Sequence, residues 1–247
     1  MRKTNYLPLV LFCWLISTNV NSQGIELEVV TEVLHPYQYE NQYGQPSGFS
    51  LEVIKELLNR LGVNPKIEFY PWSRSYQIAQ SRKNVLIFSL TRTTQREGLF
   101  HWIGKLTNEE YYFFKLKNNN FKALNINDLK SYTIIVNKDS SMNDFLKSYD
   151  FLNIERTSSV EQIPKMLFDG RADILFGPDV VVKAGLEGLG YDFSKFTKVF
   201  QTPEAEADLY IAMSLGSDPK YVDKVTRVYE LMLRDGTVSQ IRKKHNL

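Results

Sequence analysis

The stretch VLIFSLTRTTQRE, residues 85–97, decides the fold of this chain. Residues 85–90 are apolar except for Ser89, and a short apolar run of this length is typical of a strand buried inside a sheet. Residues 91–97 then change abruptly to hydroxyl-bearing and charged side chains. The stretch therefore predicts a buried strand that ends in a polar segment, and this segment is the main candidate for a binding site.

The residues before this stretch alternate between strand and helix patterns. The expected elements are strands at 25–31 and 66–70, a turn or hairpin rich in glycine and proline at 37–48, and a short helix at 73–81. A longer helix lies between the first two strands, where Ser50 can cap its start and Gly62 can end it. Its leucine and isoleucine side chains recur at the spacing of one helix face.

The same alternation restarts after an aromatic strand at residues 110–116, where the polar residues 117–120 indicate a crossing into a second lobe. The elements expected there are strands at 132–137, 153–157 and 172–177, a helix that begins at Ser141, and a helix from the capping box of Ser159 and Gln162 to Phe168. The C-terminal part is expected to hold a strand at 207–213, a helix capped by Asp218 before Pro219, and a last helix from Thr237.

This order of elements predicts an α/β fold in which the sheets are largely parallel. We expect residues 23–116 and 203–247 to form one lobe and residues 117–202 to form the second, with two crossing strands between them.

The N-terminus has the layout of a secretory signal peptide. Arg2 and Lys3 precede an apolar run at residues 6–16, which is too short for a membrane-spanning helix, and small residues follow up to Ser22. We expect cleavage after Ser22 and a periplasmic protein. The only cysteine, Cys13, lies within the signal, so the mature chain has no disulfide.

Charge and histidine spacing exclude several classes of partner. The chain has 30 basic and 28 acidic residues, and the signal holds two of the basic ones and none of the acidic ones. The mature protein is therefore neutral, which argues against a nucleic-acid partner. His35, His101 and His245 lack the spacing of metal ligands, so no cofactor and no metal are expected.

Several motifs together resemble one known family. Pro36-Tyr37 followed by Gly48-Phe49-Ser50-Leu51-Glu52 looks like its opening "P-F/Y … G-F-D-x-D/E", and residues 89–97 look like its "G-x-T-x-T-x-E-R" segment. Residues 100–104 and Asp169-Gly170-Arg171-Ala172-Asp173 match later motifs. This order resembles the family 3 extracellular solute-binding proteins, the polar amino-acid-binding components of ABC importers. The resemblance implies a type II periplasmic binding protein fold, with a mostly parallel sheet flanked by helices in each lobe.

The resemblance also implies ligand-binding residues in the first lobe. In relatives, the residues that match Thr91 and Arg96 hold the α-carboxylate of the ligand. A guanidinium has a planar fork that fits a carboxylate, and hydroxyls and backbone N–H groups complete such a site. Ser89 belongs to the same segment. Trp72 and Tyr37 lie where relatives place aromatic side chains around the apolar part of the ligand.

Alternative roles remain open for some of these residues. Arg96 could pair with Glu97 or Glu110 at the surface, and Trp72 could be an ordinary core residue. Arg74 could reach the cleft or only lie on its helix surface, Arg92 is a weaker candidate contact, and Trp102 is expected in the core.

In the second lobe, Ser140 and Ser141 fall where relatives have a Gly-Thr loop that opens a helix and binds carboxylate through its N–H groups. The glycine itself is missing. Where relatives have an aspartate for the ligand ammonium, this chain has Pro178, and Asp179 follows one position later. We therefore expect a carboxylate-bearing, amino-acid-like solute, with Asp179 as a candidate contact.

The sequence as a whole indicates a monomeric binding protein that closes by a hinge around a small ligand. An inner-membrane permease and ATPase complex, or a sensory receptor, is the expected partner. The alternative is an enzyme that resembles the cyclohexadienyl dehydratases, for which Glu204 and Glu206 are the only candidate acid or base residues.

Overall fold

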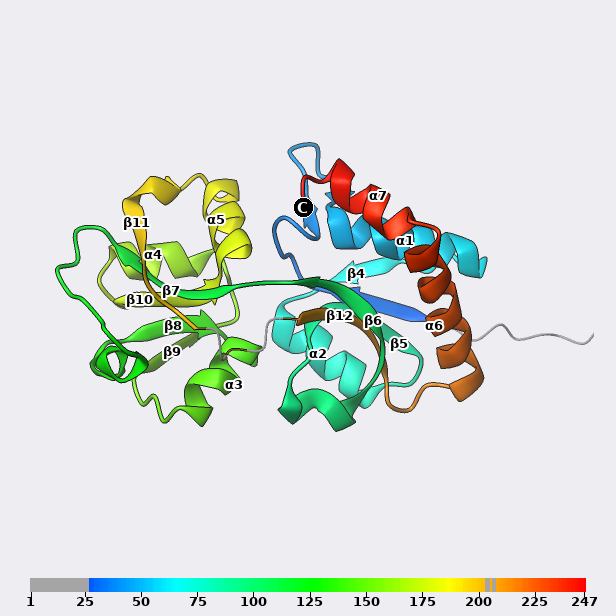
Figure 1. The fold of residues 1–247 in the computed structure, drawn as a ribbon, viewed down its shortest axis with the longest axis horizontal. Coiled ribbons are helices and arrows are strands. Elements are labelled where there is room, and N and C mark those ends of the chain that lie inside the picture. Colours follow the sequence, from blue (N-terminus) through cyan, green and yellow to red (C-terminus); the bar gives the residue numbers. More distant parts are fainter. Residues whose placement is uncertain (1–26, 203–204, 206–207) are drawn as a thin grey trace, which may run out of the picture.

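The computed structural model describes residues 27–202, 205 and 208–247. Two lobes lie side by side, and the long β6–β7 segment runs from one to the other (Figure 1). Each lobe is built on its own five-stranded sheet. The α/β prediction is therefore confirmed. Within the described ranges, no helix has the length and apolar character needed to cross a membrane.

The sheet of the first lobe has the strand order β4-β1-β5-β12-β6. Its strands are β1 (Glu28–Thr31), β4 (Ile67–Phe69), β5 (Val85–Thr91), β6 (Phe100–Asn108) and β12 (Asp208–Ser214). β1 is parallel to β4 and β5, whereas β12 is antiparallel to both β5 and β6. All seven residues of β5 are buried, as its apolar sequence predicts.

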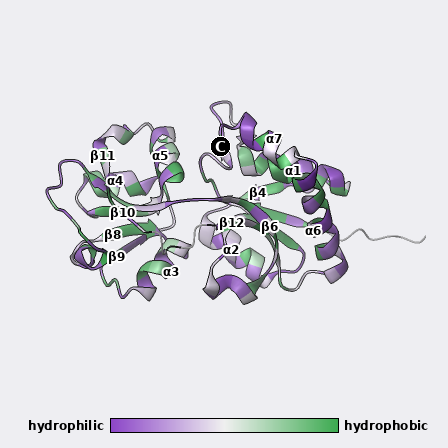
Figure 2. Cartoon of the chain, viewed as in Figure 1, coloured by the Kyte–Doolittle hydropathy of each residue, from purple (hydrophilic) through white to green (hydrophobic). Residues whose placement is uncertain are grey.

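Helices cover both faces of this sheet. They are α1 (Phe49–Leu61), α2 (Trp72–Ser81), α6 (Pro219–Arg234) and α7 (Thr237–Lys244). Val29, Leu86 and Phe88 share a core with α1, α6 and α7. On the opposite face, Val30 and Ile87 pack with Trp72 and Ile78 of α2. Figure 2 shows hydrophobic residues along the strands and hydrophilic residues on parts of the outer helices.

The sheet of the second lobe has the order β11-β7-β10-β8-β9. Its strands are β7 (Tyr111–Leu116), β8 (Ile134–Asn137), β9 (Ile154–Thr157), β10 (Ile174–Pro178) and β11 (Phe196–Gln201). β10, β8 and β9 are parallel, and β7 is antiparallel to β10 and β11. Its helices are α3 (Ser141–Ser148), α4 (Gln162–Phe168) and α5 (Asp179–Gly188). The remaining elements are the hairpin β2 (Tyr39–Glu40) and β3 (Pro46–Ser47) and the 3-10 turns η1 (Thr94–Leu99), η2 (Ile126–Ser131) and η3 (Phe193–Lys195).

The chain passes between the sheets at the junction of β6 and β7. β6 ends at Asn108 in the first sheet, and β7 begins at Tyr111 in the second. Residues 111–116, which the sequence assigned to the first lobe, therefore pair within the second sheet. The aromatic strand pairs with β10 because its buried side chains, such as Phe113, stack on Phe176.

Two predicted helix caps are absent. Ser50 does not cap α1, because the helix begins at Phe49 and the carbonyl of Tyr37 accepts hydrogen bonds from the N–H groups of Ser50 and Leu51. The hairpin before α1 thus supplies the cap that a side chain was expected to supply. The capping box of Ser159 and Gln162 is also wrong, because α4 begins without a side-chain cap and the Ser159 hydroxyl donates to Glu161.

Candidate functional site

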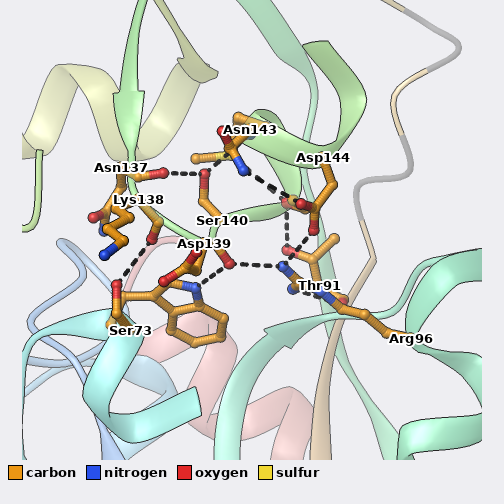
Figure 3. Close-up of polar contacts among 12 residues, drawn as sticks. Ser73, Thr91, Arg96, Asn137, Lys138, Asp139, Ser140, Asn143 and Asp144 are labelled. Atoms are coloured by element: carbon orange, nitrogen blue, oxygen red, sulfur yellow. Dashed lines mark hydrogen bonds and ion pairs between the residues drawn. The ribbon is translucent and has the colours of Figure 1, made fainter. Parts of the chain in front are cut away.

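Arg96 lies at the contact between the two lobes. It sits in η1, shortly after β5, and the residue is only 1% exposed. One terminal nitrogen donates to the carbonyl oxygen of Asp139 at 3.1 Å and to the carboxylate of Asp144 at 3.3 Å, both in the second lobe (Figure 3). The other donates to the carbonyl of Thr91 at 3.3 Å. The guanidinium therefore connects the end of β5 with the start of α3.

The surface pairs suggested for Arg96 do not form. Glu97 accepts hydrogen bonds from Arg92, and Glu110 accepts one from the Tyr112 hydroxyl. Arg92 also lies over the rings of Trp102 and Tyr210. The two arginines of this segment thus have different environments, since Arg96 is buried between the lobes whereas Arg92 is partly exposed.

Aromatic rings of α2 lie beside the Arg96 guanidinium. Its central carbon is 5.6 Å from the ring centre of Trp72 and 4.9 Å from that of Tyr76, which are cation–π distances. The Trp72 indole N–H donates to the Asp139 carbonyl at 2.8 Å, and the Ser73 hydroxyl donates to the Lys138 carbonyl. The first turn of α2 therefore contacts the same second-lobe loop as Arg96. Arg74 points elsewhere, because its guanidinium lies over Tyr70.

Hydroxyl groups from both lobes form a second interlobe contact. The Ser141 hydroxyl donates to Thr91 Oγ1 at 3.2 Å, and the Tyr111 hydroxyl lies 3.4 Å from Thr91 Oγ1 and 3.3 Å from Ser141 Oγ. All three side chains are buried. The end of β5, the start of β7 and the start of α3 thus meet at these hydroxyls.

The loop before α3 adopts the required turn without the expected glycine. Asp139 has a φ of 59°, a left-handed conformation that aspartate tolerates better than most residues. Ser140 then caps α3, because its hydroxyl accepts a hydrogen bond from the N–H of Asn143 at 3.2 Å and donates to the Asn137 carbonyl. The Lys138–Asp139 carbonyls therefore face the first lobe, where Ser73, Trp72 and Arg96 bind them.

Three residues that were predicted to contact the ligand instead make contacts within a single lobe. The Ser89 hydroxyl donates to Gln38 and Ser50 inside the first lobe. Tyr37 is 2% exposed and packs in the core with α1. Asp179 forms an ion pair of 2.7 Å with Lys198 of β11. The structure thus brings Trp72, Thr91, Arg96 and Ser141 together, with Ser140 next to them in the chain, and it gives Ser89, Tyr37 and Asp179 other contacts. Glu204 and Glu206 lie outside the described residues.

Glu32, Asn137 and Asp144 lie beside the candidate site although the sequence did not single them out. Glu32 follows β1, and Asn137 donates to its carboxylate at 3.2 Å. Burial raises the pKa of Glu32 to about 8, while Arg96 and the Asn137 hydrogen bond act in the opposite direction. The position of Glu32 directly after the first strand could have indicated it. β1 and β5 are parallel neighbours, so their carboxyl ends share one edge of the sheet.

A cavity of about 160 Å³ separates the residues after β1 from the second lobe. Glu32, Leu34 and His35 line it on one side, and Asn137, Ser140, Phe176 and residues of α4 and α5 on the other. Larger hollows lie elsewhere, for example one against β4 lined by Glu28, Lys66 and Arg82. None of the predicted site residues lines that hollow, whereas Ser140 lines the cavity between the lobes and Ser141 lines another interlobe hollow of about 220 Å³.

A second buried carboxylate, Glu109, lies where the chain crosses between the lobes. Glu109 is 8% exposed, and its Oε1 atom has no hydrogen-bond partner among the described residues. Burial and the negative charge of Glu32 raise its pKa to about 8, although the Tyr37 hydroxyl acts in the opposite direction. In the folded protein, Glu109 therefore holds its proton through neutral pH.

We predict that Glu109 makes the protein less stable as the pH rises. Between the unfolded pKa near 4.5 and the folded pKa of about 8, the folded state binds more protons, so stability declines across this window. Glu109→Gln is neutral at every pH and is expected to reduce this decline and to melt higher than wild type at pH 8. Melting temperatures at pH 5, 6.5 and 8 measure both effects.

Glu110→Gln is the matched control, because Glu110 is the exposed neighbour. A residual decline is expected in Glu109→Gln, since burial also raises the pKa of Glu32. If Glu109→Gln and Glu110→Gln lose stability with pH as steeply as wild type, Glu109 is not a buried neutral acid.

Two α/β lobes that meet at buried polar groups define a two-lobed solute-binding protein, in which the site lies between the lobes. Residues 27–247 match the bacterial extracellular solute-binding proteins, family 3, and the chain belongs to this family. The resemblance inferred from the motifs is thus confirmed.

Individual relatives support this assignment. The L-cystine-binding protein TcyA of Bacillus subtilis (strain 168) is 26% identical over 235 residues, which cover 92% of this chain and 82% of that protein. A histidine kinase sensor domain with similarity to periplasmic binding proteins has a TM-score of 0.78 at 17% identity, with 88% of this chain and 95% of that chain covered. An ancestral arginine-binding protein bound to arginine has a TM-score of 0.75 at 20% identity, with coverage of 88% and 96%. These two structures show the shared fold.

Proposed function

We propose that this protein captures a small, carboxylate-bearing, amino-acid-like solute between its lobes and delivers it to an ABC importer. The observation that carries this proposal is the buried Arg96 at the contact between the lobes. The proposal agrees with the relatives, which include proteins whose names specify the binding of cystine or arginine.

The Arg96 guanidinium has the donors that a ligand carboxylate needs. Asp144 already places a carboxylate oxygen 3.3 Å from one terminal nitrogen. The Nε atom of Arg96 is buried and has no hydrogen-bond partner within the described residues. A carboxylate that replaced Asp144 could use this second donor and accept two parallel hydrogen bonds, the geometry in which arginine binds carboxylates most strongly.

The interlobe contacts explain how binding would couple to closure. The Lys138–Asp139 carbonyls and the Ser141 hydroxyl contact the first lobe only when the lobes are together. A ligand that contacts Arg96 and α3 at once favours this closed arrangement, because it gains both sets of contacts only there. Residues 109–110, between β6 and β7, are the proposed hinge.

We further propose a periplasmic location and binding without chemical turnover. The basic and apolar residues of the N-terminus support export with cleavage after Ser22. The family consists of extracellular solute-binding proteins, which supports a membrane permease and ATPase complex as the partner.

The experiment that tests this function is a thermal-shift screen of residues 23–247 against amino acids, organic acids, polyamines and small peptides. A ligand at about 100 times its dissociation constant stabilises the folded state by about 2.7 kcal/mol. We expect the stabilising compounds to carry a carboxylate. The proposal is wrong if only amines without a carboxylate raise the melting temperature.

A further inference from the structure

The interlobe cavity beside Glu32 has an apolar wall in the second lobe. Its lining includes Met142, Ile163, Leu175, Phe176, Val182 and Leu186. Val33 and Leu34 add apolar surface from the segment after β1. Its volume is about 160 Å³. Such a wall suits an aliphatic group and does not suit a charged chain, which would lose its hydration there.

Two side chains at the edge of this cavity, Asn137 and Glu32, offer oxygen atoms that can accept hydrogen bonds from a ligand. Asn137 uses its amide nitrogen to donate to Glu32, and its Oδ1 atom is buried without a partner among the described residues. Glu32 contributes carboxylate oxygens at the same edge. An ammonium group has three N–H donors and no acceptor, so it can satisfy both residues at once.

The charges around the cavity also favour an ammonium group. The described residues that line it include the carboxylates Glu32 and Glu161 and neither lysine nor arginine. His35 is also part of the lining, and burial lowers its pKa, which favours the neutral ring. A second carboxylate on the ligand would therefore meet no lysine or arginine in this lining, and its charge would further favour the protonated form of Glu32. An ammonium, in contrast, returns Glu32 to its ionised form, because an opposite charge lowers the pKa that burial raises.

Arg96 contacts the same second-lobe loop that borders this cavity. It donates to the Asp139 carbonyl, and the next residue, Ser140, lines the cavity. Its positive charge also acts on Glu32. One α-amino acid could therefore place its carboxylate at Arg96 and its ammonium at Glu32 and Asn137.

We infer that the cavity selects α-amino acids with a branched aliphatic side chain, with Glu32 and Asn137 as the acceptors for the ammonium. The inference rests on the proposed function, since it requires the ligand carboxylate at Arg96. The acidic residue that binds the ammonium would then be Glu32 in the first lobe. In the second lobe this chain has Pro178 where relatives have an aspartate for that role.

Isothermal titration calorimetry on residues 23–247 tests this inference with four probes. They are L-leucine, L-arginine, 4-methylpentanoate, which lacks the ammonium, and 3-methylbutylamine, which lacks the carboxylate. We expect L-leucine to bind at least about 10-fold more tightly than each of the others. The two analogues each lack a charged hydrogen-bonding group, and the guanidinium of L-arginine would lose its hydration against the apolar wall. Glu32→Gln should weaken L-leucine binding at least 10-fold and leave 4-methylpentanoate unchanged. Glu161→Gln is the control for the second carboxylate of the lining.

A cavity-filling variant tests the apolar part separately. Gly185 lines the cavity, and a Cβ atom there would have no atom within 4 Å, so Gly185→Leu should fold and fill the space. It is expected to weaken L-leucine at least 10-fold and to leave L-alanine unchanged. Binding of L-arginine in preference to L-leucine, or equal binding of L-leucine and 4-methylpentanoate, overturns the inference and leaves the proposed function intact. Equal binding of L-leucine and 3-methylbutylamine contradicts the proposed function as well.

Discussion

Arg96→Ala is expected to weaken binding of the captured solute at least about 100-fold, which corresponds to about 2.7 kcal/mol. The loss is large because the guanidinium is buried and hydrogen-bonded to the second lobe, so its removal leaves the ligand carboxylate without its charged donor and removes one of the two donors to the Asp139 carbonyl. Arg96→Lys keeps the charge but loses the planar fork, and its affinity should lie between those of wild type and Arg96→Ala. Titration calorimetry with the compound found by thermal shift measures the three affinities.

Arg92→Ala is the matched control for Arg96→Ala. Arg92 has the same side chain four positions earlier, but it pairs with Glu97 on the outside of the first lobe. Its removal should leave affinity unchanged. Circular dichroism of each variant checks that the fold is retained. If Arg96→Ala keeps wild-type affinity in a folded protein, Arg96 contacts the other lobe and not the ligand.

Gly48→Ala is expected to destabilise the protein by about 2–6 kcal/mol. Gly48 has a φ of 117°, which L-residues rarely adopt, and a strained backbone of this kind costs about 1–3 kcal/mol. A Cβ atom at this position would lie 2.3 Å from the carbonyl oxygen of Tyr37, and overpacking adds about 1–3 kcal/mol. That same carbonyl accepts the first N–H groups of α1, so the helix start cannot move away freely. The melting temperature should fall by about 10 °C or more.

Gly98→Ala provides the control for this substitution. A Cβ atom at Gly98 would have no atom within 4 Å, and its φ lies outside the left-handed region. The melting temperature of Gly98→Ala should therefore stay close to that of wild type. If Gly48→Ala melts at the same temperature as Gly98→Ala, the Tyr37 carbonyl does not fix the start of α1.

Much of the fold could be predicted from the sequence because its strands and helices have strong local patterns. Residues 85–90 are apolar throughout apart from Ser89, and Asp218 caps α6 as its position before proline predicts. The errors arose where a distant segment decides the local structure. α1 is capped by the carbonyl of Tyr37, and β7 belongs to the second sheet because of its pairing with β10. Neither contact leaves a signal within a short window of sequence.

The candidate site was harder to predict, because a family motif indicates where a site residue lies in the sequence but not which atoms its side chain contacts. Thr91, Arg96 and Trp72 meet the second lobe, whereas Ser89 in the same segment donates to Gln38 inside the first. Asp144 resembled an ordinary acidic residue in the first turn of a helix, yet it reaches Arg96 of the other lobe. Glu32 has no motif of its own, and its importance follows from the parallel pairing of β1 with β5.

The most direct test of the central claim compares a captured amino acid with its primary carboxamide. The two differ only in the group that Arg96 is proposed to bind, and calorimetry on wild type and Arg96→Ala separates that contact from all others. We predict that wild type binds the amino acid at least about 100-fold more tightly than the carboxamide, and that Arg96→Ala binds both with similar, weak affinity. Equal affinity of wild type for the two compounds would contradict the account.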